Sequence, residues 1–381
     1  MAPLSPVLRR ALLRRARLQP RHIRCLATAT DHPTQQQPFP SSNRVKIVEV
    51  GPRDGLQNEK RSIPLATKLD LIRRLAATGL TSIEAGSFVS PKWVPQMASS
   101  GEILEHILTS PPSKQKQQQP ITYSFLAPNM KGFDAASAIL SKHPTSFSPT
   151  TSTTGPAGLP NIELAVFAAA TESFSQKNLN ASIAKSLSNF HPVITGAKSA
   201  GLRVRAYISV VLGCPFEGHD VSPHRVAEIA RDLLEMGADE ISLGDTTGMG
   251  TAPRTKALLD CLSQAGIRNE DVAMHFHDTF GQALVNTAVA LEHGVRTFDS
   301  SVGGLGGCPY SPGATGNVAT ENMVYFLESL GMDTGVDLDA VADIGEWISG
   351  EVGRGNDSAV GKAVLGQRRR ERGEKGTQPQ T

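Results

Sequence analysis

SPHRVAEIARDLLEMGADEISLG, residues 222–244, contains the unit that decides the fold. A serine–proline pair opens it, as in the first turn of many helices, and Val226, Ile229 and Leu233 recur at helical spacing. Gly237 stands where a helix is expected to end, and the short apolar run DEISLG follows after one residue. The pattern predicts a helix that leads directly into a buried strand.

The same alternation recurs along the chain. Eight short apolar runs are separated mostly by such helices, and eight strand–helix units fit a chain of 381 residues as one barrel. We therefore predict an α/β fold, a (β/α)8 TIM barrel with a C-terminal helical extension. A dinucleotide-binding sheet is less favoured, because no GxGxxG follows the first run. The predicted strands are VKIVEV (45–50), SIEAG (82–86), ITYSFL (121–126), NIELAVF (161–167), RVRAYISVV (203–211), DEISLG (239–244), DVAMHF (271–276) and VRTFDS (295–300).

Composition changes mark two insertions within the barrel domain, which we place at residues 44–345, and a tail that follows the domain. Residues 109–120 and 143–160 are polar and rich in Pro, Ser, Thr and Gln, so we expect flexible surface insertions that leave the barrel intact. Residues 346–381 are basic and are expected to form a flexible C-terminal tail, beginning as a helix that frays.

Residues 1–30 contain seven arginines and no acidic residue, which is typical of a mitochondrial transit peptide. The alternative is a disordered basic tail that binds acidic surfaces. The formal charge of +2 for the whole chain becomes about −5 once this segment is removed, which argues against a nucleic-acid partner. No apolar run is long enough to span a bilayer, so we expect no membrane partner. The predicted location is the mitochondrial matrix.

The four cysteines show no CxxC spacing, so the sequence contains no evident zinc knuckle or disulfide framework. Cys25 lies in the leader, and Cys261 lies on a predicted helix, where it is most simply a core residue. Cys308 lies in the glycine-rich loop GGLGGCP, which can close over a ligand, so we interpret this thiol as a reactive acid or base. Cys214, in the similar GCP of residues 213–215, is the second candidate.

HFHDTFGQ, residues 275–282, places two imidazoles two positions apart on a predicted strand, so both point to the same face. In a TIM barrel the chemistry lies at the C-terminal ends of the strands, where the seventh, eighth and first strands are neighbours. His275 and His277 can therefore meet the carboxylate of Asp54 and the amide oxygen of Asn317 there. Two nitrogen and two oxygen ligands suit a six-coordinate divalent metal, Mg²⁺ or Mn²⁺.

Each of these residues also has an ordinary structural explanation. Asp54 can cap a turn before Gly55, and Asn317 can be a turn residue beside Gly316. A single histidine is more often a core or surface residue than a ligand. Taken together at one rim of a barrel, these explanations are much less persuasive than a metal site. The other polar residues predicted at this rim are Arg53, Glu84, Ser87, Asp245, Asp278, Cys308 and Glu321.

Several motifs resemble those of 3-hydroxy-3-methylglutaryl-CoA (HMG-CoA) lyases of the mitochondrial type, in order over residues 45–335. GPRDG and HxHDT also occur in a wider group of metal-dependent barrels that includes isopropylmalate and homocitrate synthases. The cysteine-containing glycine loop does not occur in those synthases. The motifs are GPRDGLQNEK (51–60), SFVSPKWVPQMA (87–98), GCPFEG (213–218), LGDTTGMGT (243–251), HFHDTFGQAL (275–284) and GGLGGCPYSPGATGN (303–317).

The resemblance implies cleavage of (S)-HMG-CoA to acetyl-CoA and acetoacetate, the last step of leucine degradation and of ketone-body formation. It implies one divalent metal, Mg²⁺ or Mn²⁺, the small-molecule substrate HMG-CoA as partner, and a homodimer. The implied metal ligands are Asp54, His275, His277 and Asn317; the implied catalytic residues are Arg53, Cys308, His275, Asp245 and Glu84; the substrate-binding candidates are Arg53, Gln57, Lys60 and Ser87.

Three alternatives remain open from the sequence. A related condensing enzyme, similar to isopropylmalate or homocitrate synthase, would run similar enolate chemistry in the opposite direction. A non-catalytic metal- or CoA-binding barrel would lack a ligand, acid or base of the constellation. A lyase for another, bulkier 3-hydroxyacyl-CoA would share every motif, because none of them measures the pocket behind the C3 methyl group.

Overall fold

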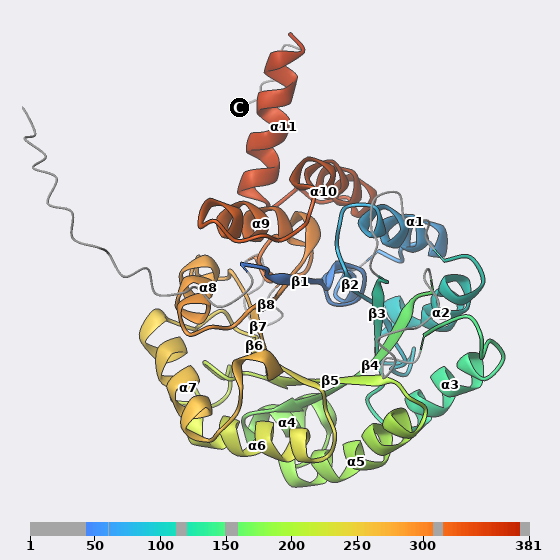
Figure 1. Ribbon diagram of the computed structural model, residues 1–381, viewed down its shortest axis with the longest axis vertical. Coiled ribbons are helices and arrows are strands. Elements are labelled where there is room, and N and C mark those ends of the chain that lie inside the picture. Colours follow the sequence, from blue (N-terminus) through green and yellow to red (C-terminus); the bar gives the residue numbers. More distant parts are fainter. Residues whose placement is uncertain (1–42, 60, 112–119, 149–158, 308–314, 374–381) are drawn as a thin grey trace, which may run out of the picture. The chain divides into compact units, whose positions relative to one another are not determined.

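Eight parallel strands, β1 to β8, pair in sequence order, and β1 also pairs with β8 to close a barrel (Figure 1). The computed structural model describes residues 43–59, 61–111, 120–148, 159–307 and 315–373. Every predicted apolar run contains one strand, so the predicted TIM barrel is confirmed. The strands are β1 Lys46–Glu49, β2 Ser82–Ser87, β3 Thr122–Leu126, β4 Asn161–Ala169, β5 Arg203–Ser209, β6 Glu240–Asp245, β7 Val272–Phe276 and β8 Thr297–Ser300.

Helices surround the barrel on its outside (Figure 1). They are α1 Leu65–Ala76, α2 Ser100–Thr109, α3 Met130–Leu140, α4 Glu172–Leu179, α5 Ile183–Ser199, α6 Pro223–Glu235, α7 Ala252–Gln264, α8 Ala283–Glu292, α9 Thr320–Ser329, α10 Leu338–Val352 and α11 Ala359–Glu371. Four short turns are η2 Gly51–Gly55, η3 Pro95–Met97, η4 Asn269–Asp271 and η5 Val302–Gly304. None of the helices in the described ranges combines the length and apolarity that a membrane span requires.

The helix before β6 forms as its sequence predicts. The Ser222 hydroxyl accepts a hydrogen bond from the Arg225 N–H and caps α6, and Pro223 occupies the first turn. Gly237 has a φ of +109°, the left-handed conformation that lets the chain leave the helix and enter β6. Local capping thus sets the length of the strand–helix unit.

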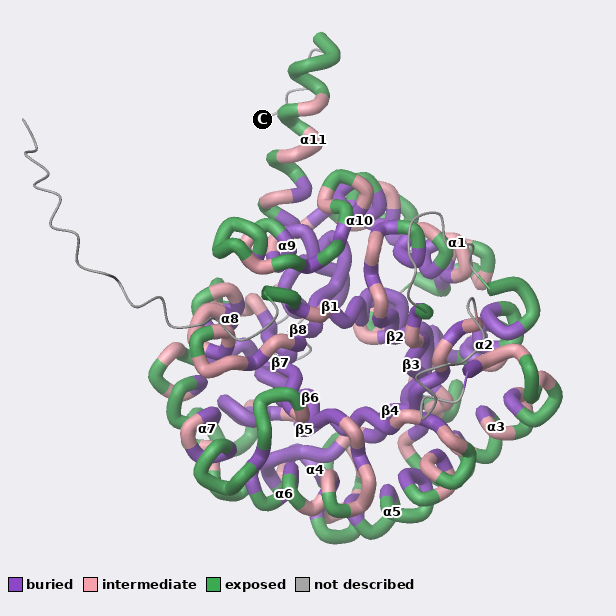
Figure 2. The backbone as a smooth tube through the Cα atoms, viewed as in Figure 1, coloured by how far each residue is buried: buried purple, intermediate pink, exposed green. Residues whose placement is uncertain are grey.

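The main apolar core lies between the barrel and its helices. Leu71, Ile72 and Leu75 on α1 are buried against the strands, as are Val226 and its helical neighbours on α6. Burial is continuous along the strands, whereas the outer faces of the helices are exposed (Figure 2).

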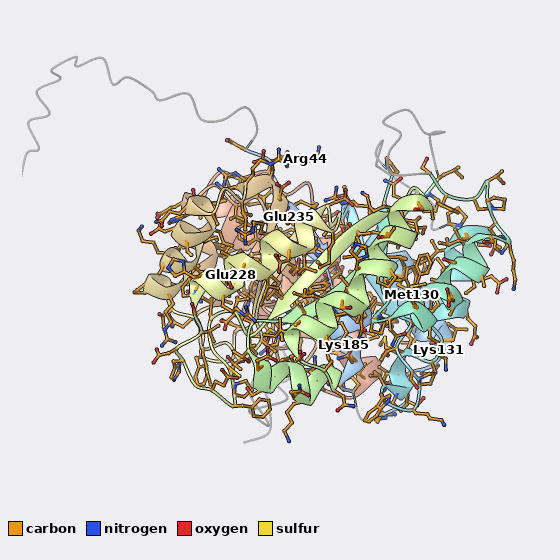
Figure 3. All side chains as sticks on the ribbon, turned by 90° about the horizontal axis from the view of Figure 1, so that it is seen from below. Arg44, Met130, Lys131, Lys185, Glu228 and Glu235 are labelled. Carbon is orange, nitrogen blue, oxygen red and sulfur yellow. The ribbon has the colours of Figure 1, made fainter. Side chains whose placement is uncertain are left out.

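The outer faces of the helices carry charged side chains. Lys185 on α5 and Glu228 and Glu235 on α6 are exposed and lie on the outside of the ribbon (Figure 3). α5 and α6 thus each present an apolar face to the barrel and a charged face to solvent.

The C-terminal segment is more ordered than we expected from its basic composition. α10 crosses the predicted domain boundary at residue 345, and α10 and α11 together make residues 346–352 and 359–371 of the expected flexible tail of residues 346–381 helical. Ser358 caps α11 by accepting from the Gly361 N–H at 2.9 Å, and Arg368 on α11 donates to Asp343 on α10 at 3.0 Å. The predicted helical extension is confirmed, and caps and ion pairs explain why it continues so far.

The insertions lie mostly outside the described residues, at 112–119 and 149–158. β2 pairs with β3, with one register shift between Glu84 and Gly86, and β3 pairs with β4. The barrel is therefore intact, as predicted. Residues 1–42, which include the predicted transit peptide, also lie outside the described part of the chain.

Gly79 provides a test of this packing, because its φ is +106° and a Cβ atom there would lie 2.0 Å from the Gly335 carbonyl oxygen. We expect Gly79→Ala to lower the free energy of unfolding by at least about 2 kcal/mol, since both the conformation and the close approach exclude a side chain. Gly350→Ala is the control, because Gly350 is exposed within α10 with nothing within 4 Å of its Cβ position. Urea denaturation measures both variants, and equal loss of stability would contradict the prediction.

Candidate active site

Three potential metal ligands meet at the C-terminal end of the barrel. Asp54 lies in η2 after β1, His275 is on β7, and His277 directly follows that strand. One ligand atom from each of the three residues lies within 4.8 Å of the others. The sequence-based prediction that these side chains converge is therefore correct, and this metal cluster suits a divalent cation.

The turn that presents Asp54 is a π-helix, a wide turn that is often found at functional sites. The Val50 carbonyl accepts from the Asp54 N–H at 2.7 Å and from the Gly55 N–H at 3.2 Å. A Cβ at Gly51 would lie 2.5 Å from the Glu49 carboxylate, and one at Gly55 would lie 2.7 Å from a serine hydroxyl. Both glycines of GPRDG are therefore required by close approach.

Asp54 is held as a carboxylate by its neighbours. The Arg53 Nη1 atom lies 2.7 Å from Asp54 Oδ1, and the Asn317 amide donates to Asp54 Oδ2 at 2.8 Å. Burial would raise the pKa of Asp54, but the charges of Arg53 and His275 and the hydrogen bond from Asn317 outweigh it and lower the pKa to about 2. Asp54 is thus ionised throughout the physiological range, as a metal ligand must be.

The two imidazoles lie close together, with 5.2 Å between their ring centroids. His275 Nδ1 lies 3.2 Å from Asp299 Oδ2, and its Nε2 lies 3.9 Å from Asp54 Oδ2. Burial and the neighbouring His275 lower the pKa of His277 to about 3, so this ring stays neutral and can bind a cation through a nitrogen lone pair.

Two buried polar atoms of the predicted metal ligands have no hydrogen-bond partner within the described ranges. They are His277 Nδ1 and Asn317 Oδ1, and an isolated bridge pairs the backbones of these two residues. Unpartnered buried acceptors are costly unless something binds them. These two atoms lie beside the ionised carboxylate of Asp54, and this set of groups fits a divalent metal. Asn317 Oδ1 would then be a further ligand.

Arg53 is fixed on its other side by a buried acid. Its Nη2 lies 2.7 Å from Glu84 Oε2, which also accepts from the Tyr207 hydroxyl at 3.1 Å. Burial would lower the pKa of Arg53, but Glu84 and Asp54 raise it, so the guanidinium stays charged. Burial raises the pKa of Glu84 despite that ion pair. The structure therefore holds a rigid cation directly beside the metal cluster.

Asp245 is buried nearby but makes different contacts. Both of its carboxylate oxygens accept from the Gly250 N–H at 3.1 Å, and burial raises its pKa to about 7. Asp245 ends β6 opposite Phe276 of β7, one position beyond the pair formed by Gly244 and His275. Its observed role is to hold the loop after β6.

The remaining predicted residues lie around the barrel mouth or outside the described residues. Ser87 ends β2, where its hydroxyl accepts from the Val89 N–H at 3.3 Å, and Gln57 is half-buried after η2. Lys60 and Cys308 lie outside the described residues.

The described ends of the Cys308 loop lie near the metal cluster. Gly307 pairs with Thr315, and the Asn317 amide donates to the Leu305 carbonyl at 3.2 Å. The base of the loop therefore lies beside the predicted amide ligand.

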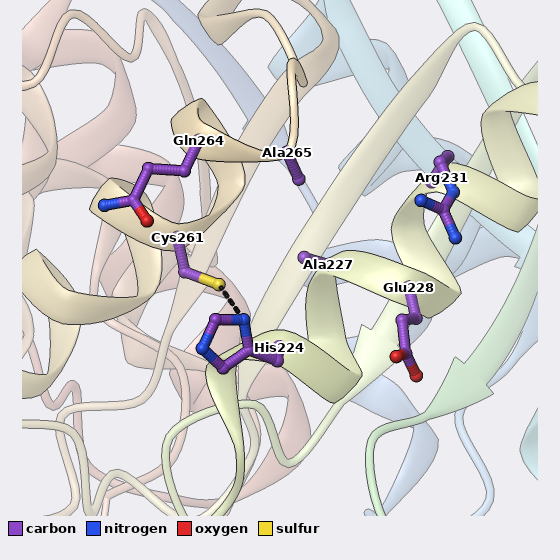
Figure 4. A pocket seen from close by; sticks show the side chains of 7 residues that line it. All are labelled: His224, Ala227, Glu228, Arg231, Cys261, Gln264 and Ala265. Carbon is purple, nitrogen blue, oxygen red and sulfur yellow. Dashed lines mark hydrogen bonds between the residues drawn. The ribbon is translucent and has the colours of Figure 1, made fainter.

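Two other predicted cysteine assignments are tested by the structure. Cys261 is buried on α7, as predicted, and its Sγ lies 3.3 Å from His224 Nδ1 of α6 in a pocket on the outside of the barrel (Figure 4). Cys214 is fully buried, and the Thr171 hydroxyl donates to its Sγ at 3.2 Å. Cys261 therefore lies apart from the barrel mouth, and Cys214 is a packed thiol.

The HMGL-like family model matches residues 44–348. The chain belongs to the HMGL-like family. It is 49% identical over 322 residues to the 3-hydroxy-3-isohexenylglutaryl-CoA/hydroxy-methylglutaryl-CoA lyase of Pseudomonas aeruginosa, with 84% of this chain and 97% of the relative covered. It is 47% identical over 321 residues to the mitochondrial hydroxymethylglutaryl-CoA lyase of Bos taurus, with 84% of this chain and 90% of the relative covered. The crystal structure of hydroxymethylglutaryl-CoA lyase from Pseudomonas aeruginosa has a TM-score of 0.74 at 48% identity, covering 86% of this chain and 99% of that chain.

Family membership confirms the predicted resemblance to HMG-CoA lyases and the predicted enzyme class, a lyase.

Sequence reasoning nevertheless missed several residues of this HMGL-like site. Tyr207 contacts Glu84, Asp299 contacts His275, and Arg205 contacts Asp299. The sequence did contain a signal for these three residues. Each is a charged or phenolic residue within a predicted apolar strand, which indicates that part of the barrel interior is polar.

Two buried carboxyl groups anchor the loops of the HMGL-like site. Glu49 Oε1 accepts from the Gly51 N–H at 2.8 Å and from the Val302 N–H at 3.0 Å, so it joins η2 to η5. Glu321 accepts from the Gly303 N–H at 3.1 and 3.0 Å. Burial raises the pKa of Glu49 to about 7 and that of Glu321 to about 8.

These raised pKa values predict a pH-dependent stability. A carboxyl group whose pKa is higher in the folded state contributes stability below its ordinary pKa near 4.5 and loses it as pH rises through about 8. Glu321→Gln mimics the protonated group, so we expect it to be more stable than the wild type at pH 9 by ~1 kcal/mol or more, with little difference at pH 5. Thermal melting measures this, with the exposed Glu235→Gln on α6 as control. A pH-independent difference between Glu321→Gln and wild type would contradict the expectation.

Proposed function

We propose that this protein cleaves (S)-HMG-CoA to acetyl-CoA and acetoacetate with a bound divalent metal ion, Mg²⁺ or Mn²⁺. The observation that carries the proposal is the convergence of Asp54, His275 and His277 beside the fixed guanidinium of Arg53. Relatives named hydroxymethylglutaryl-CoA lyase, 47% to 50% identical over at least 84% of the chain, support it.

Asp54, His275, His277 and the Asn317 amide oxygen would hold the metal. When bound, the ion supplies Lewis acidity that lowers the pKa of the substrate C3 hydroxyl and orients it with a neighbouring carbonyl oxygen. The unpartnered Asn317 Oδ1 supports its assignment as a ligand. Histidine and oxygen ligands without a thiolate favour Mg²⁺ or Mn²⁺ over a structural zinc site.

Cleavage of the C2–C3 bond requires a base for the hydroxyl proton and a stabilised position for the released electron pair. His275 has Nδ1 engaged by Asp299 and Nε2 directed at the cluster, which leaves no lone pair for proton transfer. Asp245 is therefore the preferred base, directly or through water, because its pKa of about 7 matches that task.

The released electron pair becomes the enolate of the acetyl thioester. Arg53, held between Asp54 and Glu84, is charged and rigid, so it can donate hydrogen bonds to the enolate oxygen as charge develops. Protonation of the enolate carbon then gives acetyl-CoA, and we assign this proton to the Cys308 thiol. The position of the loop base beside Asn317 supports that assignment.

The substrate-binding and cellular assignments complete the proposal. Gln57, Lys60 and Ser87 are proposed to contact the acyl-CoA, because the first two follow η2 and the third ends β2 at the barrel mouth. Mitochondrial relatives and the arginine-rich segment of residues 1–30 support a matrix enzyme of leucine degradation and ketone-body formation. A homodimer remains part of the proposal.

A second candidate is a lyase that also accepts a bulkier 3-hydroxyacyl-CoA. It is favoured by one observation, the name of the 49% identical relative, which includes both 3-hydroxy-3-isohexenylglutaryl-CoA and hydroxymethylglutaryl-CoA. A shared catalytic cluster would serve both substrates, since cleavage involves the same C2–C3 bond.

The test is acetoacetate formation from HMG-CoA by the purified protein, with and without EDTA. We expect one acetoacetate per acetyl-CoA, loss of turnover with chelator, and recovery when Mg²⁺ or Mn²⁺ is added. Release of free CoA from acetyl-CoA plus a 2-oxo acid would instead indicate a condensing enzyme. Preference for isohexenylglutaryl-CoA over HMG-CoA would establish the second candidate.

The two cysteines give a matched pair in the same assay. Cys308→Ala is expected to lower kcat by at least roughly a hundredfold without changing metal content, because it removes a general acid. Cys261→Ala, on the outer α6–α7 pocket, is expected to retain turnover. Near-normal turnover of Cys308→Ala would remove the thiol from the mechanism.

A further inference from the structure

A line of charges, buried except for Lys46 at its outer end, crosses the barrel interior and ends at one imidazole of the metal cluster. Lys46 of β1 pairs with Glu240 of β6 at 2.6 Å, and Glu240 pairs with Arg205 of β5 at 2.9 Å. Arg205 Nη2 then pairs with Asp299 of β8 at 2.5 Å, and Asp299 contacts His275 of β7 at 3.2 Å. Of these residues, only His275 has a part in the proposed reaction, as a metal ligand.

Stability alone does not account for this arrangement. The Arg205 and Asp299 side chains are 1% and 0% exposed, in a position where TIM barrels ordinarily pack branched apolar side chains. A buried ion pair recovers its desolvation cost only with good geometry, and apolar residues of similar volume are often as stable. The charges at this point therefore call for a functional explanation.

Asp299 is placed to fix His275 in one orientation and one tautomer. Its Oδ2 atom faces His275 Nδ1 at 3.2 Å and accepts from the Ser242 hydroxyl at 2.8 Å, while its Oδ1 faces Arg205. Since an ionised carboxylate only accepts hydrogen bonds, the proton of His275 resides on Nδ1. The lone pair is then on Nε2, the atom that lies 3.9 Å from Asp54 Oδ2.

We propose that Asp299 is a positioning residue that presents His275 to the metal, and that Arg205 holds Asp299 in place. The inference rests on the metal site of the proposed function. It makes the two imidazoles unequal, because His277 Nδ1 has no partner in the described residues, whereas His275 Nδ1 has a carboxylate. Outer carboxylates of this kind orient metal-binding histidines and make them stronger ligands.

The test is the affinity of the full chain for Mn²⁺, measured by electron paramagnetic resonance of the free ion. Asp299→Asn is expected to raise the Mn²⁺ dissociation constant roughly 10- to 100-fold at unchanged stoichiometry. Glu240→Gln is the matched control, because it also removes a buried carboxylate paired with Arg205 but does not touch His275. We expect its dissociation constant to stay within about threefold of wild type.

Wild-type affinity in Asp299→Asn, or an equal loss in Glu240→Gln, would overturn the inference. Failure of the wild type to bind Mn²⁺ would overturn the metal-dependent function as well. Normal Mn²⁺ binding without HMG-CoA cleavage would contradict the proposed function while leaving the positioning role testable by affinity, so the two failures are distinguishable.

A measurement on the wild type keeps the inference falsifiable if Asp299→Asn does not fold. In protein labelled with ¹⁵N-histidine, the His275 signals are assigned by their loss in His275→Gln. At a pH where the ring is neutral in the metal-free protein, we expect Nδ1 to be the protonated nitrogen and Nε2 to be unprotonated. The opposite tautomer would contradict the assigned role of Asp299.

Discussion

The pairing of β1 with β8 is the constraint on which the site depends. These strands are far apart in sequence, and their register places Val48 opposite Asp299 and Glu49 opposite Ser300. Asp54 follows β1 within one wide turn, and β7 is the next neighbour of β8, so closure of the barrel brings a carboxylate to the imidazoles of β7. Glu49 reinforces the closure, because its carboxylate joins the backbone of η2 to that of η5. The metal cluster is thus a consequence of barrel topology rather than of any local motif.

Charge inside the barrel is distributed so that Arg53, Asp54 and His277 at the mouth each have a fixed protonation state. Arg53 lies between Asp54 and Glu84 and remains a cation, whereas Asp54 remains an anion with a pKa of about 2. His277 is neutral because burial disfavours its charged form. Such preorganisation has a cost in desolvation, but it removes the need to reorganise charges during bond cleavage. In the proposed reaction, these ion pairs hold Arg53 where it can stabilise a developing enolate.

The sequence predicted the barrel because strand periodicity is legible in it, and it predicted the convergence of Asp54, His275 and His277 because barrel closure makes their strands neighbours. Eight β-branched runs located the strands, and the spacing of His275 and His277 put both rings on one face. The side-chain direction of Asp245 was harder to predict. Side chains alternate between the two faces of a strand, but this rule does not determine the direction of a residue at the very end of the strand. Asp299 was not predicted, since its partners come from other strands and no local spacing records them. The helical tail was hidden by its basic composition, although its serine cap was legible.

The central claim is that four side chains remote in sequence bind one divalent metal. Crystals soaked in Mn²⁺, with diffraction measured near the manganese absorption edge, test it most directly. We predict a single strong anomalous peak bonded to Asp54, His275 Nε2, His277 and Asn317 Oδ1. A peak elsewhere with none at this position, or a metal bound by His277 while His275 points away, would contradict the account.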